Sequence, residues 1–331
     1  MNIRKRHGEW ILSTIVVLSG SNALLGSSEP CAQTFPNRPM TIVVPYPPGA
    51  STDQLARLVQ PKLAAGLGQP VIIEHRPGAA GTIGAAYVAK SPPDGYRILL
   101  ATQPILAISP YLQKDMGFDP IKELTPLTNG VNALLAVTVH PSLPVSSLAE
   151  LMDYGRKNPG VLTFGSAGNG SPQHIGAVML GLRGQYQLTH VPYKGGSPMV
   201  TDLIAGHIKA GIVTYSTIKQ FVADKKLRVV AIGEARRFAG APDIPTLGET
   251  LPGFELTTWL CFVAPIGLPQ SLVSMLSGEL VKALKTEDVA AKLLDLGLIV
   301  NAEGPEALAK MIRADYETYG QIIRENRISG D

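Results

Sequence analysis

The chain has 331 residues, of which 45% are apolar and 17% are charged, and its formal net charge is +3. Disordered chains have fewer apolar residues and a higher net charge, so this composition indicates a packed protein, and the length suits two α/β lobes. No dense run of Lys and Arg with interleaved aromatic residues occurs, which argues against a nucleic-acid surface.

Residues 1–32 have the features of a signal peptide. A basic segment at positions 4–6 precedes an apolar stretch over residues 10–25. We expect cleavage after Ala32 and export of a soluble mature chain, because no later apolar stretch approaches the roughly 18 residues of a spanning helix. An uncleaved N-terminal anchor is one alternative. Lipidation of Cys31 is another, although the residues before it form a poor lipobox.

The first part of the mature chain alternates between strands and helices. Apolar runs such as residues 40–45 are typical of strands buried on both faces, and short loops between them predict a parallel sheet with right-handed crossovers. Pro61 falls inside the first helix, which it should bend or interrupt. The expected strands are residues 40–45, 71–74 and 96–100, and the expected helices are residues 51–67 and 82–90.

A second series of the same kind begins near Leu134. Residues 256–264 are then predicted to be an extended crossover, with a mostly helical tail from Gln270 onward. The expected strands of this series are residues 133–139, 162–164, 190–193, 210–213 and 228–232, and its helices are residues 147–157, 173–182 and 197–205.

The chain is expected to leave the first lobe near residues 130–135 and to return near residues 256–262, so that two crossings form a hinge. Ligands of open α/β sheets lie beyond the carboxyl ends of the strands, so the cleft between the lobes is the predicted site. One large doubly wound domain is the alternative. The predicted domains are a signal peptide (1–32), lobe 1 (33–132 plus 257–331) and lobe 2 (133–256).

Two glycine-containing loops join a strand to a helix, one in each predicted lobe. In residues 47–53, Gly49 allows close approach of the backbone, and Ser51 or Thr52 is expected to cap the helix. Residues 165–171 repeat the design with three glycines. Free amides at a positive helix end suit a carboxylate, whereas a capped turn without a ligand is the alternative for each loop. The pairing of the two loops favours a ligand site.

Other residues near these loops are assigned less directly. Asp53 is expected to stabilise the first turn of its helix rather than to touch a ligand. Gln103 follows the third strand and is a further expected wall of the site, while Lys194 is placed at the surface or near the hinge. The loop at residues 76–82 either lines the cleft or simply turns the chain.

No catalytic constellation is found in the sequence. The string Gly-x-Ser-x-Gly, a Walker A loop and Gly-x-Gly-x-x-Gly are all absent, and the mature histidines are widely spaced. Once Cys31 is removed with the signal peptide, Cys261 stands alone and cannot form an internal disulfide. We therefore expect no enzymatic activity, no metal and no cofactor.

The loops contain a series of motifs in a fixed order, at residues 46–53, 67–71, 74–81, 93–96, 166–171, 190–196 and 264–265. With these motifs the chain resembles the tripartite tricarboxylate transporter substrate-binding proteins, also called the Bug or TctC family, over essentially all of residues 35–328. The resemblance implies an α/β fold, that of a two-lobed periplasmic binding protein (type II, Venus flytrap) with two hinge crossovers. It also implies that the protein delivers a small carboxylate to a membrane permease of one large and one small subunit.

Ligand contacts of the family, some of them through bridging water, can be carried over to this sequence. We expect Gln103, His174 and Thr214 to complete the site. The residues that match the family's contacts are Pro48, Gly49, Ser51, Thr52, Ser166, Ala167, Gly168 and Ser171.

Many relatives carry an acidic residue near the position of Val213 and Thr214, where it can pair with a ligand ammonium. Its absence here predicts a simple mono- or dicarboxylate ligand rather than an amino acid. A binding protein that feeds a sensor kinase is the alternative function, and a secreted enzyme on the same lobes is a third.

Overall fold

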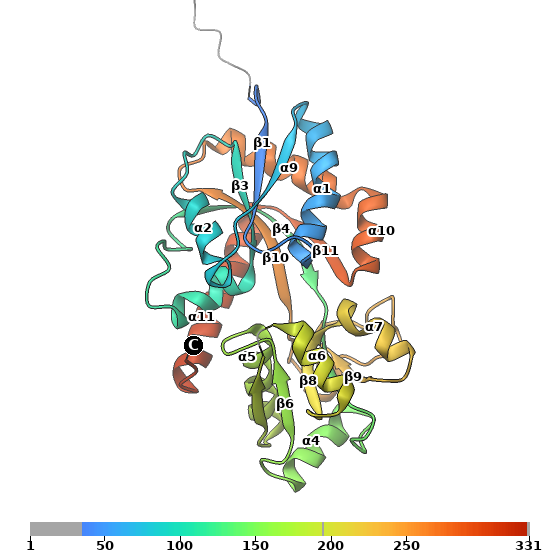
Figure 1. Cartoon of the computed structure of the whole chain (residues 1–331). Coiled ribbons are helices and arrows are strands. Elements are labelled where there is room, and N and C mark those ends of the chain that lie inside the picture. The colour runs from blue at the N-terminus through green and yellow to red at the C-terminus, as the bar shows by residue number, and fades with distance from the viewer. Residues whose placement is uncertain (1–34, 194, 330–331) are drawn as a thin grey trace, which may run out of the picture. The chain divides into compact units, whose positions relative to one another are not determined.

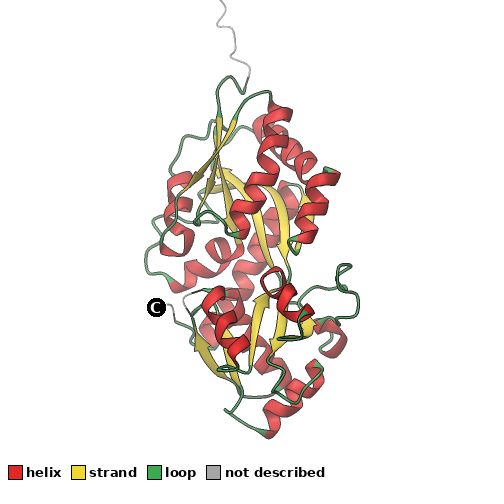
Figure 2. Ribbon diagram, turned by 45° about the vertical axis from the view of Figure 1, so that its right-hand side comes forward, coloured by secondary structure: helices red, strands yellow, loops and turns green. Residues whose placement is uncertain are grey.

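A computed structural model of the protein describes residues 35–193 and 195–329, and residues 36–331 belong to one compact unit. The predicted signal peptide, Cys31 and Lys194 lie outside the described residues, so their assignments stay predictions. Two mixed sheets flanked by helices make up the two-lobed fold (Figures 1 and 2).

The six-stranded sheet draws its strands from both ends of the described chain. Its strand order is β11–β4–β10–β3–β1–β2. Strands β1, β2 and β3 are parallel, and Ile42, Val43 and Val44 are completely buried, as predicted for a strand covered on both faces. The strands are β1 (Met40–Val44), β2 (Val71–His75), β3 (Arg97–Thr102), β4 (Leu124–Ala133), β10 (Thr258–Pro265) and β11 (Leu298–Glu303).

The five-stranded sheet is formed by the middle of the chain, in the order β7–β6–β8–β5–β9. Phe164, Leu180 and Ile212 lie in the apolar core between this sheet and its helices. The strands are β5 (Leu135–Val139), β6 (Thr163–Ser166), β7 (Thr189–Pro192), β8 (Ala210–Thr214) and β9 (Arg228–Ile232).

The prediction of parallel sheets is wrong for part of each sheet. Strand β10 is antiparallel to β3 and β4, and β5 is antiparallel to β8 and β9. Both strands follow a crossing between the lobes, so no helical crossover returns the chain to the direction that parallel pairing needs.

The segment that returns the chain to the first lobe is more than a crossover. Residues 258–265 are extended, as predicted, and they also form a central strand of the sheet. The tail is mostly helical, as predicted, and it adds β11 at the edge of the six-stranded sheet. Strand β4 also has no counterpart among the expected elements.

The helices cover the faces of both sheets (Figure 2). Helix α1 continues through Pro61, so that this proline marks no break. Helix α7 begins at Tyr215, just after the expected strand at residues 210–213, and has no counterpart among the expected helices. The helices are α1 (Ser51–Leu67), α2 (Thr82–Ala89), α3 (Ser109–Leu112), α4 (Leu148–Lys157), α5 (Pro172–Gly184), α6 (Gly196–Ala205), α7 (Tyr215–Ala223), α8 (Leu247–Thr250), α9 (Gln270–Lys285), α10 (Glu287–Asp295) and α11 (Pro305–Glu325), with short turns η1 (Ala79–Gly81) and η2 (Pro104–Ile108).

The two crossings between the sheets are short and tightly packed. Leu134 alone separates β4 from β5, and its amide donates a hydrogen bond to Gly297 O at 3.1 Å. Before the return crossing, a Cβ at Gly233 would lie 1.8 Å from Leu256 O, so only glycine fits this close approach of two backbones. The domain boundaries at 132/133 and 256/257 stay a prediction.

An apolar cluster joins the lobes beside these crossings. Ile175 of α5 packs with Ala107 and Ile108 of η2 and with Tyr319 and Ile323 of α11. Helix α11 therefore contacts elements of both lobes. Within the described residues, no helix is long and apolar enough to span a bilayer.

Candidate functional site

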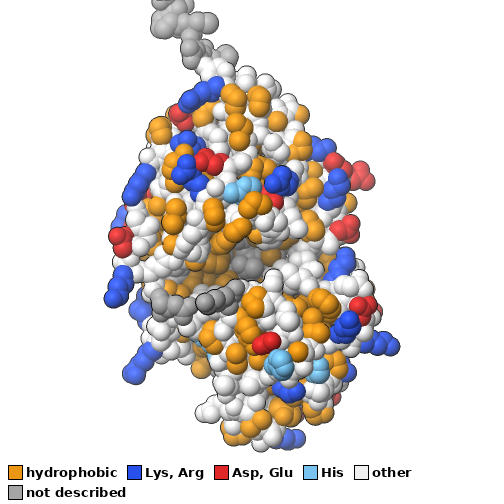
Figure 3. Space-filling model, in the orientation of Figure 1, with side chains coloured by type: hydrophobic (Ala, Val, Ile, Leu, Met, Phe, Trp, Pro, Cys, Tyr) orange, Lys and Arg blue, Asp and Glu red, His pale blue; other side chains and the backbone are white. Residues whose placement is uncertain are grey.

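A cavity of about 1110 Å³ is lined by elements from both lobes, and the surface is hollowed at this place between them (Figure 3). From the first lobe come the start of α1, the loop at Ala79 and Ala80, the end of β3, and η2 with α3. From the second lobe come the loop after β6 and the starts of three helices. Its lining includes Tyr46, Ala50, Ser51, Thr52, Ala79, Ala80, Thr102, Pro104, Ile108, Ser109, Leu112, Gln113, Lys114, Asp115, Ala133, Ala167, Asn169, Gly170, Ser171, Pro172, Gln173, Gly196, Thr214, Thr258 and Leu260.

Thr52 is a lining residue of the cavity whose buried hydroxyl has no protein partner. The residue is 2% exposed, and its Oγ1 atom has no hydrogen-bond partner among the described residues. A buried hydroxyl without a partner is costly, and the first amides of a helix also lack intrahelical acceptors. The start of α1 therefore offers several unused hydrogen-bond donors at its positive end.

The expectation that Ser51 or Thr52 caps α1 is wrong. Ala50 occupies the cap position, and no side chain accepts a hydrogen bond there. Ser51 is already the first helical residue, one position too late to act as the cap. Asp53 holds the loop instead, because its Oδ2 accepts from Gly49 N at 2.9 Å.

Asp53 is almost fully buried at the centre of a small polar cluster. Its Oδ2 also accepts from Arg57 Nε at 3.0 Å, and its Oδ1 lies 2.8 Å from His75 Nε2. Burial would raise the pKa of Asp53, but the hydrogen bonds from Arg57, Gly49 and His75 outweigh it and lower the pKa to about 2. Asp53 thus fixes the loop of Gly49 by charge-assisted hydrogen bonds.

We expect Asp53→Asn to reduce the free energy of unfolding by about 1–2 kcal/mol at pH 7, because charge-assisted bonds are lost. The pKa of Asp53 is lower in the folded chain than its ordinary 3.8, so this stabilisation is complete above pH 3.8 and is lost as pH falls toward 2. Urea unfolding measures both effects. Asp288→Asn, which breaks the exposed pair with Lys62, should leave the free energy of unfolding almost unchanged. Equal losses in the two variants would contradict the assignment.

A wall of the cavity is formed by Tyr46 and the loop that precedes α2. Tyr46 Oη donates to Ala80 O at 3.1 Å and lies 3.1 Å from Thr102 Oγ1. Ala79 and Ala80 both line the cavity with positive φ angles of 46° and 55°, a conformation that is uncommon outside glycine. Of the two alternatives for residues 76–82, the structure supports the one in which the loop lines the cleft.

The loop after β6 is folded by its own serines and glycines. Ser171 is the N-cap of α5, where its Oγ accepts from His174 N at 3.2 Å and donates to Gly168 O at 2.7 Å. Gly168 and Gly170 have φ angles of 128° and 69°, which glycine adopts without strain. The turn brings the start of α5 to the same cavity as the start of α1.

Two stacked imidazoles support this loop. The rings of His174 and His190 are parallel, with centroids 3.8 Å apart. Gly170 N donates to His174 Nδ1 at 3.0 Å, which requires that Nδ1 carry no proton, and Ser166 Oγ lies 2.6 Å from His190 Nε2. Burial, together with the adjacent His190, lowers the pKa of His174 to about 4, and burial also lowers the pKa of His190.

The burial of these two imidazoles predicts that the protein becomes less stable in acid. The folded-state pKa of His174 lies below its ordinary 6.5, so the unfolded chain takes up a proton first as pH falls from 6.5 toward 4, and the free energy of unfolding decreases across that window. Urea unfolding at several pH values tests this, with His174→Gln as the comparison. An identical pH slope in wild type and variant would contradict the assignment.

Two more helices begin at the cavity in the second lobe. Gly196 is the first residue of α6, and Thr214 is the N-cap of α7, and both line the cavity. With α1 and α5, four helices of at least nine residues therefore direct their starts at one space. Among the described lining residues only Lys114 and Asp115 carry charged side chains, so amides and hydroxyls dominate the polar surface. No cluster of metal-binding side chains occurs in the described ranges.

Comparison with known proteins identifies the family. The model of the family described as "Tripartite tricarboxylate transporter family receptor" matches residues 55–328. The chain belongs to this family. A UPF0065 protein of Pseudomonas sp. (strain P51) is 33% identical over 320 residues, which are 95% of each chain.

Solved structures of similar receptors share the fold. A protein of R. palustris solved with adipate is 31% identical, with a TM-score of 0.79 over 90% of this chain and 100% of that one. MatC from Rhodopseudomonas palustris, solved with bound malate, is 28% identical, with a TM-score of 0.73 over 87% and 100%. These neighbours agree with the two-lobed periplasmic binding-protein architecture.

The receptor's predicted contact residues fall into two groups. Ser51, Thr52, Ala167, Ser171 and Thr214 line the cavity. The other predicted contact residues are not among those that line the cavity: Pro48, Gly49, Gln103, Ser166, Gly168 and His174.

Gln103 shows how a residue of the second group is engaged. It is 1% exposed, and its Nε2 donates to Asp315 Oδ2 at 2.6 Å, to which Trp259 Nε1 also donates at 2.7 Å. The Asp315 carboxylate thus ties α11 to β10 and to the end of β3. Sequence reasoning missed Tyr46 and Gly196 as lining residues, although both lie in motifs that it had quoted.

Proposed function

We propose that this receptor captures a small mono- or dicarboxylate between its lobes and presents it to a tripartite tricarboxylate-type permease, without chemical change of the ligand. The observation that carries the proposal is the convergence of four helix starts and the unpartnered Thr52 hydroxyl on one cavity. The adipate and malate bound to two similar receptors support a carboxylate as the ligand class.

The electrostatics of the cavity favour an anion. Helix starts carry a partial positive charge and present amides without acceptors, so a carboxylate can be held without a basic side chain. The lining holds one acidic residue, Asp115, on the segment after α3, and the start of α7 at Thr214 offers none. A ligand ammonium would therefore lack a partner there, which disfavours amino acids.

We propose that the two carboxylates of a dicarboxylate are shared between the lobes. Ser51 and Thr52 would bind one end, and Ala167 and Ser171 the other, with water bridging the remaining distance. Residues behind the surface would act by shaping the loops, as the Asp53 carboxylate does for Gly49. A ligand that bridges both lobes favours the closed arrangement by its differential affinity.

Titration calorimetry with adipate, malate, hexanoate and aspartate tests the proposal. We expect saturable binding of at least one plain carboxylate and no comparable binding of aspartate. Tight binding of aspartate alone would reject the ligand class. Native mass spectrometry of the purified protein would identify a molecule retained in the cleft.

We propose that the receptor works in the periplasm after cleavage of residues 1–32, in agreement with the periplasmic proteins among its solved neighbours. Mass spectrometry of the mature protein from a periplasmic extract tests this. An N-terminus at Gln33 is expected, whereas an intact residue 1 or a lipidated Cys31 would contradict it.

A further inference from the structure

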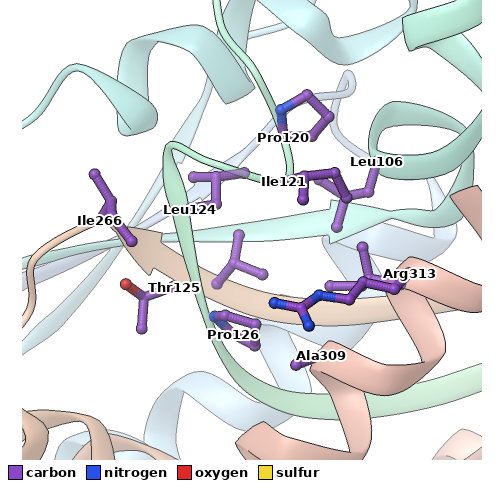
Figure 4. Close-up of a pocket in the computed structure, with 11 residues that line it drawn as sticks. Leu106, Pro120, Ile121, Leu124, Thr125, Pro126, Ile266, Ala309 and Arg313 are labelled. Atoms are coloured by element: carbon purple, nitrogen blue, oxygen red, sulfur yellow. The ribbon is translucent and has the colours of Figure 1, made fainter.

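A second cavity, of about 220 Å³, lies between α11 and the six-stranded sheet (Figure 4). It is bounded by the start of β4, the end of β10, the segment at Pro120 and Ile121, and α11. None of its lining residues lines the interlobe cavity. Turn η2 separates the two spaces, because Leu106 faces the second cavity while Pro104 and Ile108 face the first.

The walls of the second cavity are apolar, and its edge reaches the surface. The lining side chain of Ile266 is 53% exposed, which places it at the mouth. The inner walls include Leu106, Ile121, Leu124, Pro126, Val263 and Ile312.

Arg313 is the one charged residue among the described residues that line this cavity. Its side chain leaves α11 and carries the guanidinium over the apolar walls toward Pro126 (Figure 4). Within residues 35–193 and 195–329, the guanidinium has no hydrogen bond, ion pair or ring contact. Its five donors are thus available at the entrance of an apolar space.

We infer that this second cavity binds a small monocarboxylate with an apolar body, such as an aromatic acid. The apolar part fills the space between α11 and the sheet, and the carboxylate pairs with Arg313, whose planar fork suits two parallel hydrogen bonds. A cation would be repelled by the guanidinium. A small polar dianion would lose the hydration of two charges against the apolar walls but would gain only one charged partner, so it is disfavoured.

A ligand without charge fits the cavity less well, because it would cover the guanidinium without giving it a partner. Ligand pockets commonly measure about 300–1,000 Å³, so a cavity below this range suits one ring or a short chain. The site is independent of the interlobe cleft, since the two spaces share no lining residue.

Methyl NMR of the isoleucine-labelled full protein can separate the two sites, with benzoate as the probe. Ile121, Ile266 and Ile312 line the second cavity, and Ile108 lines the interlobe cleft. We expect saturable shifts of the first three methyls as benzoate is added. Shifts confined to Ile108 would overturn this inference while leaving the proposed function of the cleft intact.

Substitution of the guanidinium tests the assigned partner. Arg313→Gln should weaken benzoate binding at the three reporter methyls at least about tenfold. Lys310→Gln removes the same charge from an exposed position of α11 outside the cavity and should leave that affinity within about twofold. Benzyl alcohol, the neutral counterpart, should not saturate these methyls at the same concentrations.

Equal affinities of wild type and Arg313→Gln for benzoate, or equal binding of benzoate and benzyl alcohol, would overturn the inference. Unchanged methyl positions in the ligand-free variant would show that the cavity itself is retained.

Discussion

Thr52→Val is expected to weaken carboxylate binding by about 10- to 100-fold and, at the same time, to stabilise the ligand-free protein. The hydroxyl of Thr52 is buried in the cavity wall without a protein partner. A hydrogen bond to a charged group contributes about 1.5–3 kcal/mol, which corresponds to this loss of affinity. Valine has nearly the same shape, so the variant also removes an unsatisfied polar atom and should raise the free energy of unfolding by about 1 kcal/mol.

The opposite signs of these two effects distinguish a ligand-binding hydroxyl from a structural one. Calorimetry with the carboxylate that wild type binds gives the affinity, and urea unfolding without ligand gives the stability. Thr138→Val is the matched control, because this threonine is fully buried in β5, away from the cavity, and its Oγ1 donates to Ala136 O at 3.3 Å. It should lose stability and keep its affinity. Unchanged binding by Thr52→Val would remove Thr52 from the site.

Gly170→Ala is expected to weaken carboxylate binding about tenfold or more by disturbing the contact between the lobes. A Cβ at Gly170 would lie 1.9 Å from Leu112 Cδ1, across the interlobe cavity that both residues line. The clashing atom is the end of the flexible Leu112 side chain, so Leu112 or the loop must shift, and either shift disturbs this contact between the lobes. The arrangement in which both helix starts reach one ligand is then disfavoured.

Gly160→Ala separates this contact from backbone strain. Gly160 has a φ angle of 74°, close to the 69° of Gly170, but nothing lies within 4 Å of its Cβ position. Alanine is strained at a positive φ angle, so both variants should lose about 1–2 kcal/mol of stability from this cause. Only Gly170→Ala should also bind the carboxylate more weakly. Adding Leu112→Ala to Gly170→Ala should restore part of the binding. Equal affinities of the two glycine variants would show that the Leu112 contact is irrelevant to ligand capture.

The structure gives α11 a role that its amphipathic pattern does not indicate. Tyr319 and Ile323 pack with Ile175 of the second lobe, and Asp315 accepts hydrogen bonds from Gln103 and Trp259 behind the cleft. One helix thus contacts the floor of the site and the opposite lobe. The second cavity lies along the same helix, at Arg313.

Several elements could be predicted from local patterns alone. Strand β1 and helix α1 were expected close to their observed bounds, because an apolar run and a helical period are set by neighbouring residues. The two glycine loops were also identified by their residue types, since glycine is favoured where φ is positive, as at Gly168 and Gly170.

Strand β4 shows why other elements escaped prediction. Pro126, Asn129 and Gly130 are poor strand formers, yet β10 and β11 pair with this segment on its two sides. Strand propensity depends strongly on such neighbours, which come from more than 120 residues away in the chain. The direction of β10 was likewise set by its partners rather than by its own residues.

The sequence by itself determined the class of elements, the loops that turn at glycine and, through its motifs, the family, because each depends on residues that are close in the chain or on a matching order of motifs. Only the tertiary structure decided that the starts of α1, α5, α6 and α7 meet at one cavity, and that the Thr52 hydroxyl in its wall is buried without a partner. The physical reason is that convergence of helix ends depends on sheet order and on two crossings between lobes. Both are fixed by long-range pairing, which no local pattern encodes.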